Sequence, residues 1–539
     1  MSQDVGLDAA LRELGYFGKY NIVNYALLLF PVYLAGMYGS AFVFEASDIH
    51  YRCNIPECEG YNNNTWLEHA IPAKDGVLSK CQRYQSNNNS GTCSIQDFNT
   101  SIVKDCESFV YSDEDSAVKD FDLGCQHMKR TLIGSAHNAG LFLSLPLTGI
   151  ISDRYGRKLA LALASLMNGV FGFLRSFSSG YIMMLIFEFL EAGLGAGAYS
   201  TAFVIAMELV GPKGRVLGNT LLNGVYVIGL MSLAALSWWL QSWRNLLRLI
   251  YIPAMFVVSY YWILNESVRW LISKGRNTEA AAILKRAAKM NRVELSDEVL
   301  APLYELEKLN TDEKSKDSSN VNHKLEGNMQ SNLMKVIKSS IIRKRVVICS
   351  FLWITCTFVY YGLSINSVSL AGNKYVNFML VSFVEIPANF VCLLVLDRFG
   401  RKKVLIVTYV LSACLCIGLS FLPKDQKWLS LVLYLSGKFS ITVAYSSVYI
   451  YVSEVFPTNV RQSLLAVCSS LGRVGSTLAP MTPLLNHYYH NLPAIFFGSM
   501  ALIASILVFS LPETINVALP DTVEEAEMLS QKRSKKESA

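Results

Sequence analysis

The sequence predicts an all-α membrane protein in which twelve transmembrane helices form two six-helix bundles, with one large extracellular loop. Composition is the first reason: 52% of the 539 residues are hydrophobic and only 17% are charged, against roughly 25% in soluble domains. Secondly, the apolar residues form blocks of about 20, the length that crosses a bilayer. Thirdly, an internal repeat relates the two halves of the chain. A soluble globular chain is therefore excluded, and the abundant aromatic residues exclude a disordered one.

The predicted spans are read from the apolar blocks in chain order. They are 21–44, 131–151, 159–177, 181–209, 216–240, 244–264, 346–367, 375–396, 404–422, 428–452, 462–485 and 491–511. Residues 1–20 are polar and mixed in charge, so we expect a cytoplasmic N-terminus and no cleaved signal peptide. The expected parts are bundles at 21–264 and 346–511, a cytoplasmic linker at 265–345 and a cytoplasmic tail at 512–539.

The orientation follows from basic residues in short loops, which stay on the cytoplasmic side. Such loops follow spans 2, 4 and 8, all even-numbered, and carry Arg154, Arg157, Lys158, Lys213, Arg215, Arg398, Arg401, Lys402 and Lys403. Both termini are therefore expected in the cytoplasm of a multi-pass plasma-membrane protein.

The segment 46–130 should then be extracellular. It holds an even set of six cysteines, which predicts three disulfides in an oxidising compartment, although six cysteines allow 15 pairings; they are Cys53, Cys58, Cys81, Cys93, Cys106 and Cys125. Three Asn-x-Ser/Thr acceptors, at Asn63, Asn88 and Asn99, lie in the same segment and predict glycosylation.

The internal repeat consists of three landmarks at nearly one offset. Asp153-Arg-Tyr-Gly-Arg-Lys158 returns from Asp397 to Lys402 (397 − 153 = 244), Glu208 returns as Glu454 (454 − 208 = 246), and Glu266 returns as Glu513 (513 − 266 = 247). Six spans were therefore duplicated. We expect the repeated cytoplasmic charges to pair across the bundle interface when the cytoplasmic side is closed; they are Asp153, Arg157, Glu208, Arg215, Asp397, Arg401, Glu454 and Arg461. The alternative is that they only anchor the loops in the cytoplasm, although acidic residues contribute little to that.

These motifs resemble the signature loops of the major facilitator superfamily. More closely, the chain resembles the organic cation, organic anion and carnitine transporters, through the Cys-rich loop, Glu266-Ser-x-Arg-Trp-Leu271, Tyr360-Tyr-Gly362 and Pro512-Glu-Thr514. The resemblance implies a solute carrier that works by alternating access, with a central cavity between the bundles.

Charges in the middle of a span are costly and mark candidate functional sites. Three lie at similar depth in the second bundle: Glu385, Lys438 and Arg473. Arg473 lies in a Gly-Arg-Val-Gly-Ser sequence that resembles the anion and carnitine branches, where an Arg faces the substrate carboxylate, and a guanidinium matches a carboxylate bidentately. Glu385 could join Arg473 in accepting a zwitterion, could serve an organic cation, or could neutralise Lys438. Asn389 occupies a position where anion carriers of the family commonly have Lys.

Tyrosines complete the predicted substrate site, because their rings attract cations and their hydroxyl groups are polar. The resemblance places six of them along the cavity: Tyr38, Tyr226, Tyr360, Tyr361, Tyr445 and Tyr449. Ordinary helix packing is the alternative, and for Tyr38 and Tyr226 the two interpretations are equally supported. In span 4, Glu188 and Glu191 depart from the family pattern, which leaves proton coupling open, and we expect them to pair with Arg175.

Enzyme, metal and cofactor sites are not expected. The sequence has no phosphate-binding Gly-x-x-x-x-Gly-Lys-Ser/Thr loop, no His-Glu-x-x-His motif and no Gly-x-Ser-x-Gly elbow. The net charge of +6 is small for this length and gives no sign of nucleic-acid binding. The expected partners are a small organic ion, membrane lipid, and a counter-substrate or coupling ion. A receptor that keeps the fold without moving solute remains an alternative.

Overall fold

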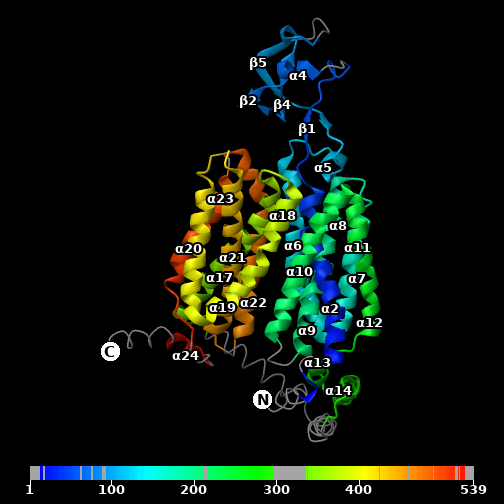
Figure 1. Cartoon of the computed structure of the whole chain (residues 1–539), viewed down its shortest axis with the longest axis vertical. Coiled ribbons are helices and arrows are strands. Elements are labelled where there is room, and N and C mark those ends of the chain that lie inside the picture. The colour runs from blue at the N-terminus through cyan, green and yellow to red at the C-terminus, as the bar shows by residue number, and fades with distance from the viewer. Residues whose placement is uncertain are drawn as a thin grey trace, which may run out of the picture.

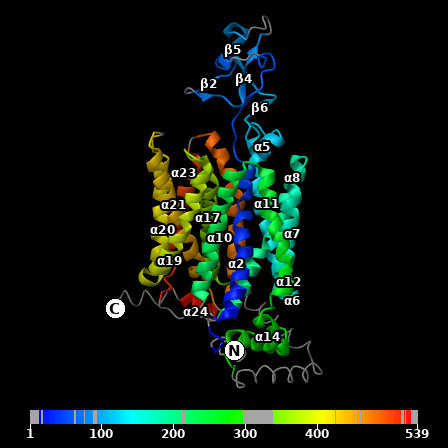
Figure 2. The same ribbon diagram turned by 45° about the vertical axis from the view of Figure 1, so that its right-hand side comes forward.

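The computed structural model describes most of the chain as long helices in two bundles that stand side by side (Figure 1; Figure 2). The described residues are 13–15, 18–60, 64–74, 77–87, 93–210, 215–295, 336, 338–423, 425–457, 460–489, 491–515, 520 and 522–528. Small strands lie beyond one end of the bundles, here called the loop end, and short helices lie beyond the other, here called the linker end. The predicted fold class is confirmed.

The first bundle is built from the N-terminal half. Its helices are α2 (Lys19–Tyr38) with α3 (Ala41–Glu45), α6 (His127–Tyr155), α7 (Arg157–Arg175), α8 (Tyr181–Gly195) with α9 (Gly197–Leu209), α10 (Arg215–Leu240), and α11 (Trp243–Phe256) with α12 (Tyr260–Ile263). The second bundle contains α17 (Ser340–Asn366), α18 (Lys374–Phe383) with α19 (Glu385–Phe399), α20 (Arg401–Leu419), α21 (Lys427–Val455), α22 (Arg461–Leu478) with the 3-10 helix η6 (Ala479–His487), and α23 (Leu492–Val508).

Ten of the described helical segments are long and apolar enough to cross a membrane. Two helices of the bundles fall outside that set. The helix α6 is 29 residues long but carries many hydroxyl, amide and charged side chains, and α23 is apolar but only 17 residues long. Both pack among the other helices of their bundles, so the architecture still has twelve crossings.

The unit at the loop end is held together mainly by disulfides. Its strands form three antiparallel pairs: β1 (Tyr51–Cys53) with β6 (Phe109–Tyr111), β2 (Ala73–Lys74) with β3 (Val77–Leu78), and β4 (Gln82–Ser86) with β5 (Phe98–Asp105). The prediction of three disulfides is confirmed, and the pairs are Cys53–Cys106, Cys58–Cys93 and Cys81–Cys125. The helix α4 (Leu67–Ala70) belongs to the unit, whereas α5 (Ala117–Asp120) packs on the first bundle. A small core such as this one needs covalent support, which the three bridges supply.

At the linker end, the repeated motifs form the same turn twice. Gly156 and Gly400 adopt φ angles of 108° and 90°, which favour glycine, between α6 and α7 and between α19 and α20. In the first turn, Glu266 accepts hydrogen bonds from the backbone N–H of Arg157 at 2.9 Å and of Lys158 at 3.3 Å. In the second, Glu513 accepts from the corresponding N–H groups at 2.9 Å and 3.2 Å. Each helix start is thus capped by a carboxylate from the end of the sixth span of its own bundle.

The linker end also carries α13 (Val268–Ser273), α14 (Asn277–Asn291) and α24 (Val523–Met528). The polar linker expected near 310–330 lies outside the described residues.

The two bundles meet through their loop-end halves. There, Ser135 on α6 donates a hydrogen bond to the carbonyl of Thr477 on α22 at 3.0 Å. The ring of Tyr375 stacks on Trp238 and Phe44, with centroids 6.1 Å and 5.6 Å apart. Among pairs in which both residues are described, all hydrogen bonds, ion pairs and ring stacks between the bundles lie in these halves.

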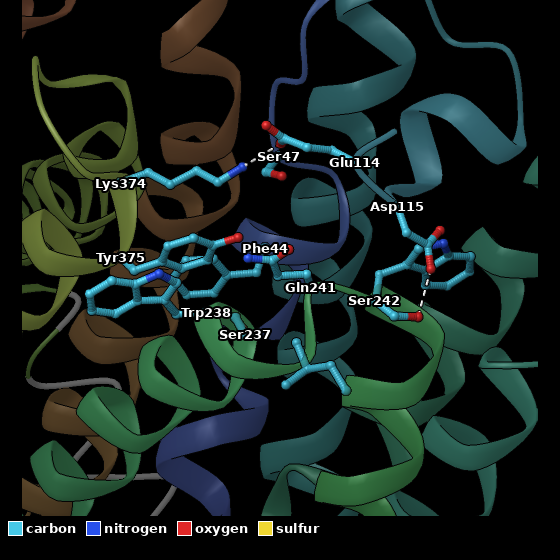
Figure 3. Close-up of a pocket in the computed structure, with 12 residues that line it drawn as sticks. Phe44, Ser47, Glu114, Asp115, Ser237, Trp238, Gln241, Ser242, Lys374 and Tyr375 are labelled. Atoms are coloured by element: carbon cyan, nitrogen blue, oxygen red, sulfur yellow. Dashed lines mark hydrogen bonds and ion pairs between the residues drawn. The ribbon is translucent and has the colours of Figure 1, made fainter. Parts of the chain in front are cut away.

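Figure 3 shows the side chains that line a pocket at the loop end. The volume of this pocket is about 170 Å³. Lys374 of α18 points across it to Glu114 of the loop segment, at 3.0 Å. Phe44, Trp238 and Tyr375 lie together below this ion pair. Side chains from both bundles and from the loop segment therefore build the contact.

Candidate functional site

Two of the three mid-span charges of the second bundle form a buried ion pair. Lys438 Nζ on α21 lies 2.9 Å from Glu385 Oε1 at the start of α19, and both side chains are almost fully buried. The ammonium also donates to Ser364 Oγ at 2.7 Å and lies 3.2 Å from the centroid of the Tyr360 ring. Glu385 is therefore already neutralised by Lys438, which is one of the alternatives that the sequence left open.

The third charge, Arg473 on α22, has a different environment. Arg473 is half-buried and lies near the phenol groups of Tyr361, Tyr445 and Tyr449. Among the residues that the structure describes, no Asp or Glu forms an ion pair with it. The arrangement leaves one positive charge beside neutral hydroxyl groups, where a negative ligand group would be favoured.

Aromatic rings form a continuous wall beside these charges. Tyr360 stacks on Tyr445 with centroids 5.3 Å apart and meets Tyr361 edge-on at 5.2 Å. Tyr445 contacts Tyr449 one helical turn further along α21, at 5.6 Å. Trp353 of α17 meets Tyr449 edge-on at 4.2 Å. Such a wall can contact an apolar or cationic part of a ligand.

The first bundle contributes two tyrosines that face this wall. Tyr226 on α10 interacts electrostatically with Tyr361, Glu385 and Arg473. Tyr199 on α9 packs edge-on against Tyr226, with centroids 5.3 Å apart. The charges and rings thus lie between the bundles, where alternating access requires a substrate site.

Two predicted site residues lie apart from Arg473. Tyr38 is buried in the first bundle, where it stacks on Tyr251 at 4.7 Å. Asn389 lies one turn after Glu385 on α19, and its side-chain oxygen accepts a hydrogen bond from Ser446 at 2.9 Å. Asn389 therefore lines the same side of the bundle, whereas Tyr38 belongs to a different cluster.

The repeated charges at the linker end pair within each bundle. Arg157 lies 2.8 Å from Asp153 and 3.5 Å from Glu208. The equivalent residue, Arg401, lies 3.3 Å from Asp397 and 3.1 Å from Glu454. Among the described side chains, the predicted pairing across the interface is not observed. In this conformation the bundles contact each other at the loop end, whereas these charges lie at the linker end. Pairing across the interface stays a prediction for the state closed at the linker end.

For the other two repeated charges, Arg461 and Arg215, the structure describes no contact across the interface between the bundles. Arg461 donates from Nε to the carbonyl of Phe456 at 3.2 Å. The side chain of Arg215 lies outside what the structure describes.

A second group of buried charges lies in the first bundle. The expected pairing of Glu188 and Glu191 with Arg175 is confirmed, by an ion pair to Glu188 and a distance of 3.7 Å to Glu191. Sequence reasoning missed the other two members, His137 on α6 and Glu45 on α3, which contact Glu188 at 3.0 Å and Arg175 at 2.8 Å. Helical periodicity within span 4 indicated Glu188 and Glu191, but it does not tell which spans are neighbours.

Near the predicted substrate site, sequence reasoning missed Tyr199, Trp353 and Ser364. A signal existed for Trp353, because it precedes Tyr360 by seven residues, which is two helical turns on the same face. The same signal existed for Ser364, which follows Tyr360 by four residues, one turn on the same face. Nothing comparable marked Tyr199, which approaches the site from the other bundle.

The glycosylation acceptors are partly described. Asn99 lies in β5 of the loop-end unit and is half-exposed. Asn63 and Asn88 lie outside the described residues.

Comparisons with known proteins agree with this arrangement. The family described as "Sugar (and other) transporter" matches residues 78–525. The chain is 31% identical to an organic cation transporter protein of Drosophila melanogaster, covering 99% of the chain and 97% of the relative. It is 30% identical to the human organic cation/carnitine transporter 2, covering 96% and 93%. A partially occluded inward-open structure of the xylose transporter XylE from E. coli covers 91% of the chain and 99% of its own length, with 16% identity and a TM-score of 0.58.

Proposed function

We propose that this chain carries small organic ions that bear a carboxylate. It belongs to the organic cation and carnitine transporters, within the sugar transporter family of the major facilitator superfamily, and is therefore a membrane transporter. Arg473 binds the carboxylate in this proposal. The observation that carries it is that Arg473 lacks an acidic partner among the described residues, whereas Glu385 is paired with Lys438.

The energetics favour this assignment of charges. A cation that leaves water needs a compensating partner, and a substrate carboxylate would supply two oxygens to the guanidinium fork. A purely cationic substrate would instead have to compete with Lys438 for Glu385 while Arg473 repelled it. The organic cation alternative that uses Glu385 is therefore the weaker one.

A zwitterionic substrate is the second candidate, and the aromatic wall supports it. Tyr360, Tyr445 and Tyr449 present ring faces and edges close to Arg473. A cationic group attached to the carboxylate could rest on these rings, because an aromatic face attracts cations. The printed name of the human relative, an organic cation/carnitine transporter, fits that chemistry.

Transport would proceed by rocking of the two bundles. In this proposal, the state with bundle contacts at the loop end gives access from the linker end. Closure at the linker end would require the repeated charges to exchange their partners within a bundle for partners across the interface. Asp153, Arg157, Glu208 and Arg215, with their repeats Asp397, Arg401, Glu454 and Arg461, form the gate in this proposal. The other substrate contacts are Tyr226, Tyr360, Tyr361 and Asn389.

We further propose a plasma-membrane location with both termini in the cytoplasm. The three disulfides support an oxidising compartment for the loop-end unit, and that unit lies at the opposite end from α13 and α14 (Figure 1). The partners are the organic ion, surrounding lipid, and a counter-substrate or coupling ion.

The test is competition uptake in cells that express the chain, with benzoate, tetraethylammonium and carnitine as anionic, cationic and zwitterionic probes. Arg473→Ala should lower the apparent affinity for the probes with a carboxylate by roughly 10- to 100-fold, the value of a charged hydrogen bond. Arg473→Lys should recover only part of it, because a point charge replaces a planar fork.

Arg276→Ala is the matched control, since Arg276 is exposed, pairs with nearby Glu279 in α14 and lies over the ring of Trp270 at 5.8 Å, far from the proposed substrate contacts. Unchanged carboxylate uptake by Arg473→Ala, at equal surface expression, would rule out the proposed role. No uptake of any probe by the wild-type chain would favour the receptor alternative.

A further inference from the structure

The buried cluster of the first bundle has one acidic group more than it has basic groups. It contains Glu45, Glu188 and Glu191 against Arg175 and His137, and each of these side chains is at most 4% exposed. With both basic groups charged, one negative charge remains uncompensated in a medium of low dielectric constant, which is costly.

Unpartnered oxygens show where that charge lies. Neither carboxylate oxygen of Glu191 has a hydrogen-bond partner, although Oε2 is 3.3 Å from His137 Nδ1 and 3.7 Å from Arg175. Oε2 of Glu45 also lacks a partner. The imidazole nitrogen that could serve Glu191 already contacts Glu188 at 3.0 Å. Two carboxylates therefore compete for one ring nitrogen, and a proton on the second would remove the conflict.

The remaining titratable groups around the cluster do not supply that charge. Tyr251 of α11 is a neutral phenol and adds no positive charge. Its hydroxyl group accepts a hydrogen bond from Arg175 at 2.9 Å. Tyr38 of α2 stacks on Tyr251 and donates to the carbonyl of Ile250 at 3.4 Å. Among the described residues, the charged and titratable groups of the cluster are therefore these two tyrosines, Glu45 on α3, His137 on α6, Arg175 on α7 and the two glutamates on α8.

The cluster lies directly behind the loop-end contact between the bundles. The ring of Phe42 on α3 packs on His137 with centroids 5.5 Å apart. Gly134, one turn before His137, leaves room for Phe42 and for Pro480 of the second bundle, since a Cβ there would lie 2.6 Å and 2.9 Å from them. Opening the loop end would withdraw Pro480 and bring water to within one side chain of His137.

The same short helix links the cluster to the aromatic closure. Glu45 ends α3, held by Arg175 at 2.8 Å, and the preceding residue, Phe44, packs on Tyr375 and Phe378 of the second bundle. The charge state of the cluster and the position of the closing aromatic residues therefore depend on one element.

We propose that this cluster is a proton-binding site, which takes up one proton from the aqueous phase when the loop end closes and releases it when the loop end opens. The proton forms an O–H bond on Glu191 or Glu45, and water is its donor and acceptor. With the proton bound, closure buries a cluster whose net charge is zero. Opening hydrates the cluster and stabilises the deprotonated carboxylate. Acidification then shifts the population toward the state closed at the loop end, by the linkage between binding and conformation.

The experiment uses purified protein in lipid nanodiscs with a Ser237→Cys reporter. Ser237 lines the loop-end pocket in Figure 3 and is only 5% exposed, so a maleimide should react with the reporter faster when the loop end opens. Cys414→Ser removes the exposed free cysteine, the other five being buried. The labelling rate is measured at pH 7.5 and pH 6.0 and divided by the rate for glutathione, which corrects for thiolate content.

The normalised rate should fall at least about threefold on acidification, and one proton allows at most about 30-fold over this interval. Glu45→Gln and Glu191→Gln, which imitate the protonated carboxyl group, should label slowly at both pH values. Asp48→Asn is the matched control: Asp48 lies three residues after Glu45, is half-exposed and pairs with Arg130 at 2.8 Å, and its change should leave the pH profile intact.

If the normalised labelling rate of the reporter, without a glutamine substitution, is the same at pH 7.5 and pH 6.0, the proposal is overturned. This result does not depend on whether the glutamine variants fold. An unaltered pH profile in both variants would also overturn the proposal. Replacing sodium chloride by potassium chloride at constant pH supplies a further arm: a shift there without a pH effect would assign the cluster to a metal cation and reject the proton. Because labelling needs no substrate, the result is independent of the proposed carboxylate specificity.

Discussion

At the scale of single residues, the proposed substrate site depends on how three charges are distributed. Glu385 and Lys438 satisfy each other, and Arg473 faces tyrosines. A buried ion pair adds little net stability when both charges are present, but removal of one partner leaves the other uncompensated. The pair therefore fixes the charge of the site at +1 without itself being available to a ligand.

Lys438→Met should destabilise the protein by roughly 3–5 kcal/mol, because Glu385 remains buried without its cation. The double variant Lys438→Met/Glu385→Gln should recover most of that loss. Thermal unfolding in detergent measures both. A double variant as unstable as the single one would show that Lys438 acts through Ser364 and the Tyr360 ring, not through Glu385.

The sequence predicted these charges well, because an ionisable residue in an apolar span is conspicuous. It did not predict their partners. Glu385 with Lys438 was one of several arrangements compatible with the pattern, and His137 and Glu45 carried no sign of belonging with Arg175. Periodicity reports which residues share a face of one helix, whereas ion pairs depend on which helices are neighbours.

At the scale of elements, the repeated turns place the gate charges. Asp153 and Asp397 lie in the last turns of α6 and α19 with 76% and 82% of their side chains exposed, and each pairs with the Arg four residues later. An exposed pair of this kind contributes at most about 1 kcal/mol. The low energy of each pair therefore permits the change of partners that the proposed transport cycle requires.

Asp153→Asn should lower the maximal transport rate by up to about fivefold, the equivalent of one exposed ion pair, without changing the order in which probes compete. Asp397→Asn, the equivalent change in the other bundle, should do the same. Initial-rate uptake with the three probes measures this. Altered competition at an unchanged rate would mean that these residues select substrate and do not gate.

At the scale of the whole molecule, the fold followed from the sequence almost completely. Block length predicted the spans, and the constant offset of the repeat predicted two equal bundles. The conformation did not follow, because closure at the loop end depends on contacts such as Tyr375 with Phe44 and Trp238 between distant segments. The disulfide pairing likewise needed the paths of the loop-end strands.

The orientation of the whole molecule is tested by modification and access. Treatment of intact cells with a glycosidase should increase the electrophoretic mobility of the wild-type chain, and Asn63→Gln/Asn88→Gln/Asn99→Gln should remove the effect. Tags at both termini should bind antibodies only after the membrane is permeabilised. A terminal tag stained on intact cells would contradict the proposed topology.

The duplicated turns also bear on how inherited variants of this gene should be interpreted. A Cβ at Gly156 would lie 2.2 Å from an oxygen of Glu266, and one at Gly400 would lie 2.8 Å from an oxygen of Glu513, on backbones with positive φ. Neither copy can substitute for the other, since each carboxylate caps only its own bundle. A missense change at any of these four positions would leave every substrate contact unaltered and still be a candidate loss-of-function allele, through misfolding and degradation before the carrier reaches the cell surface.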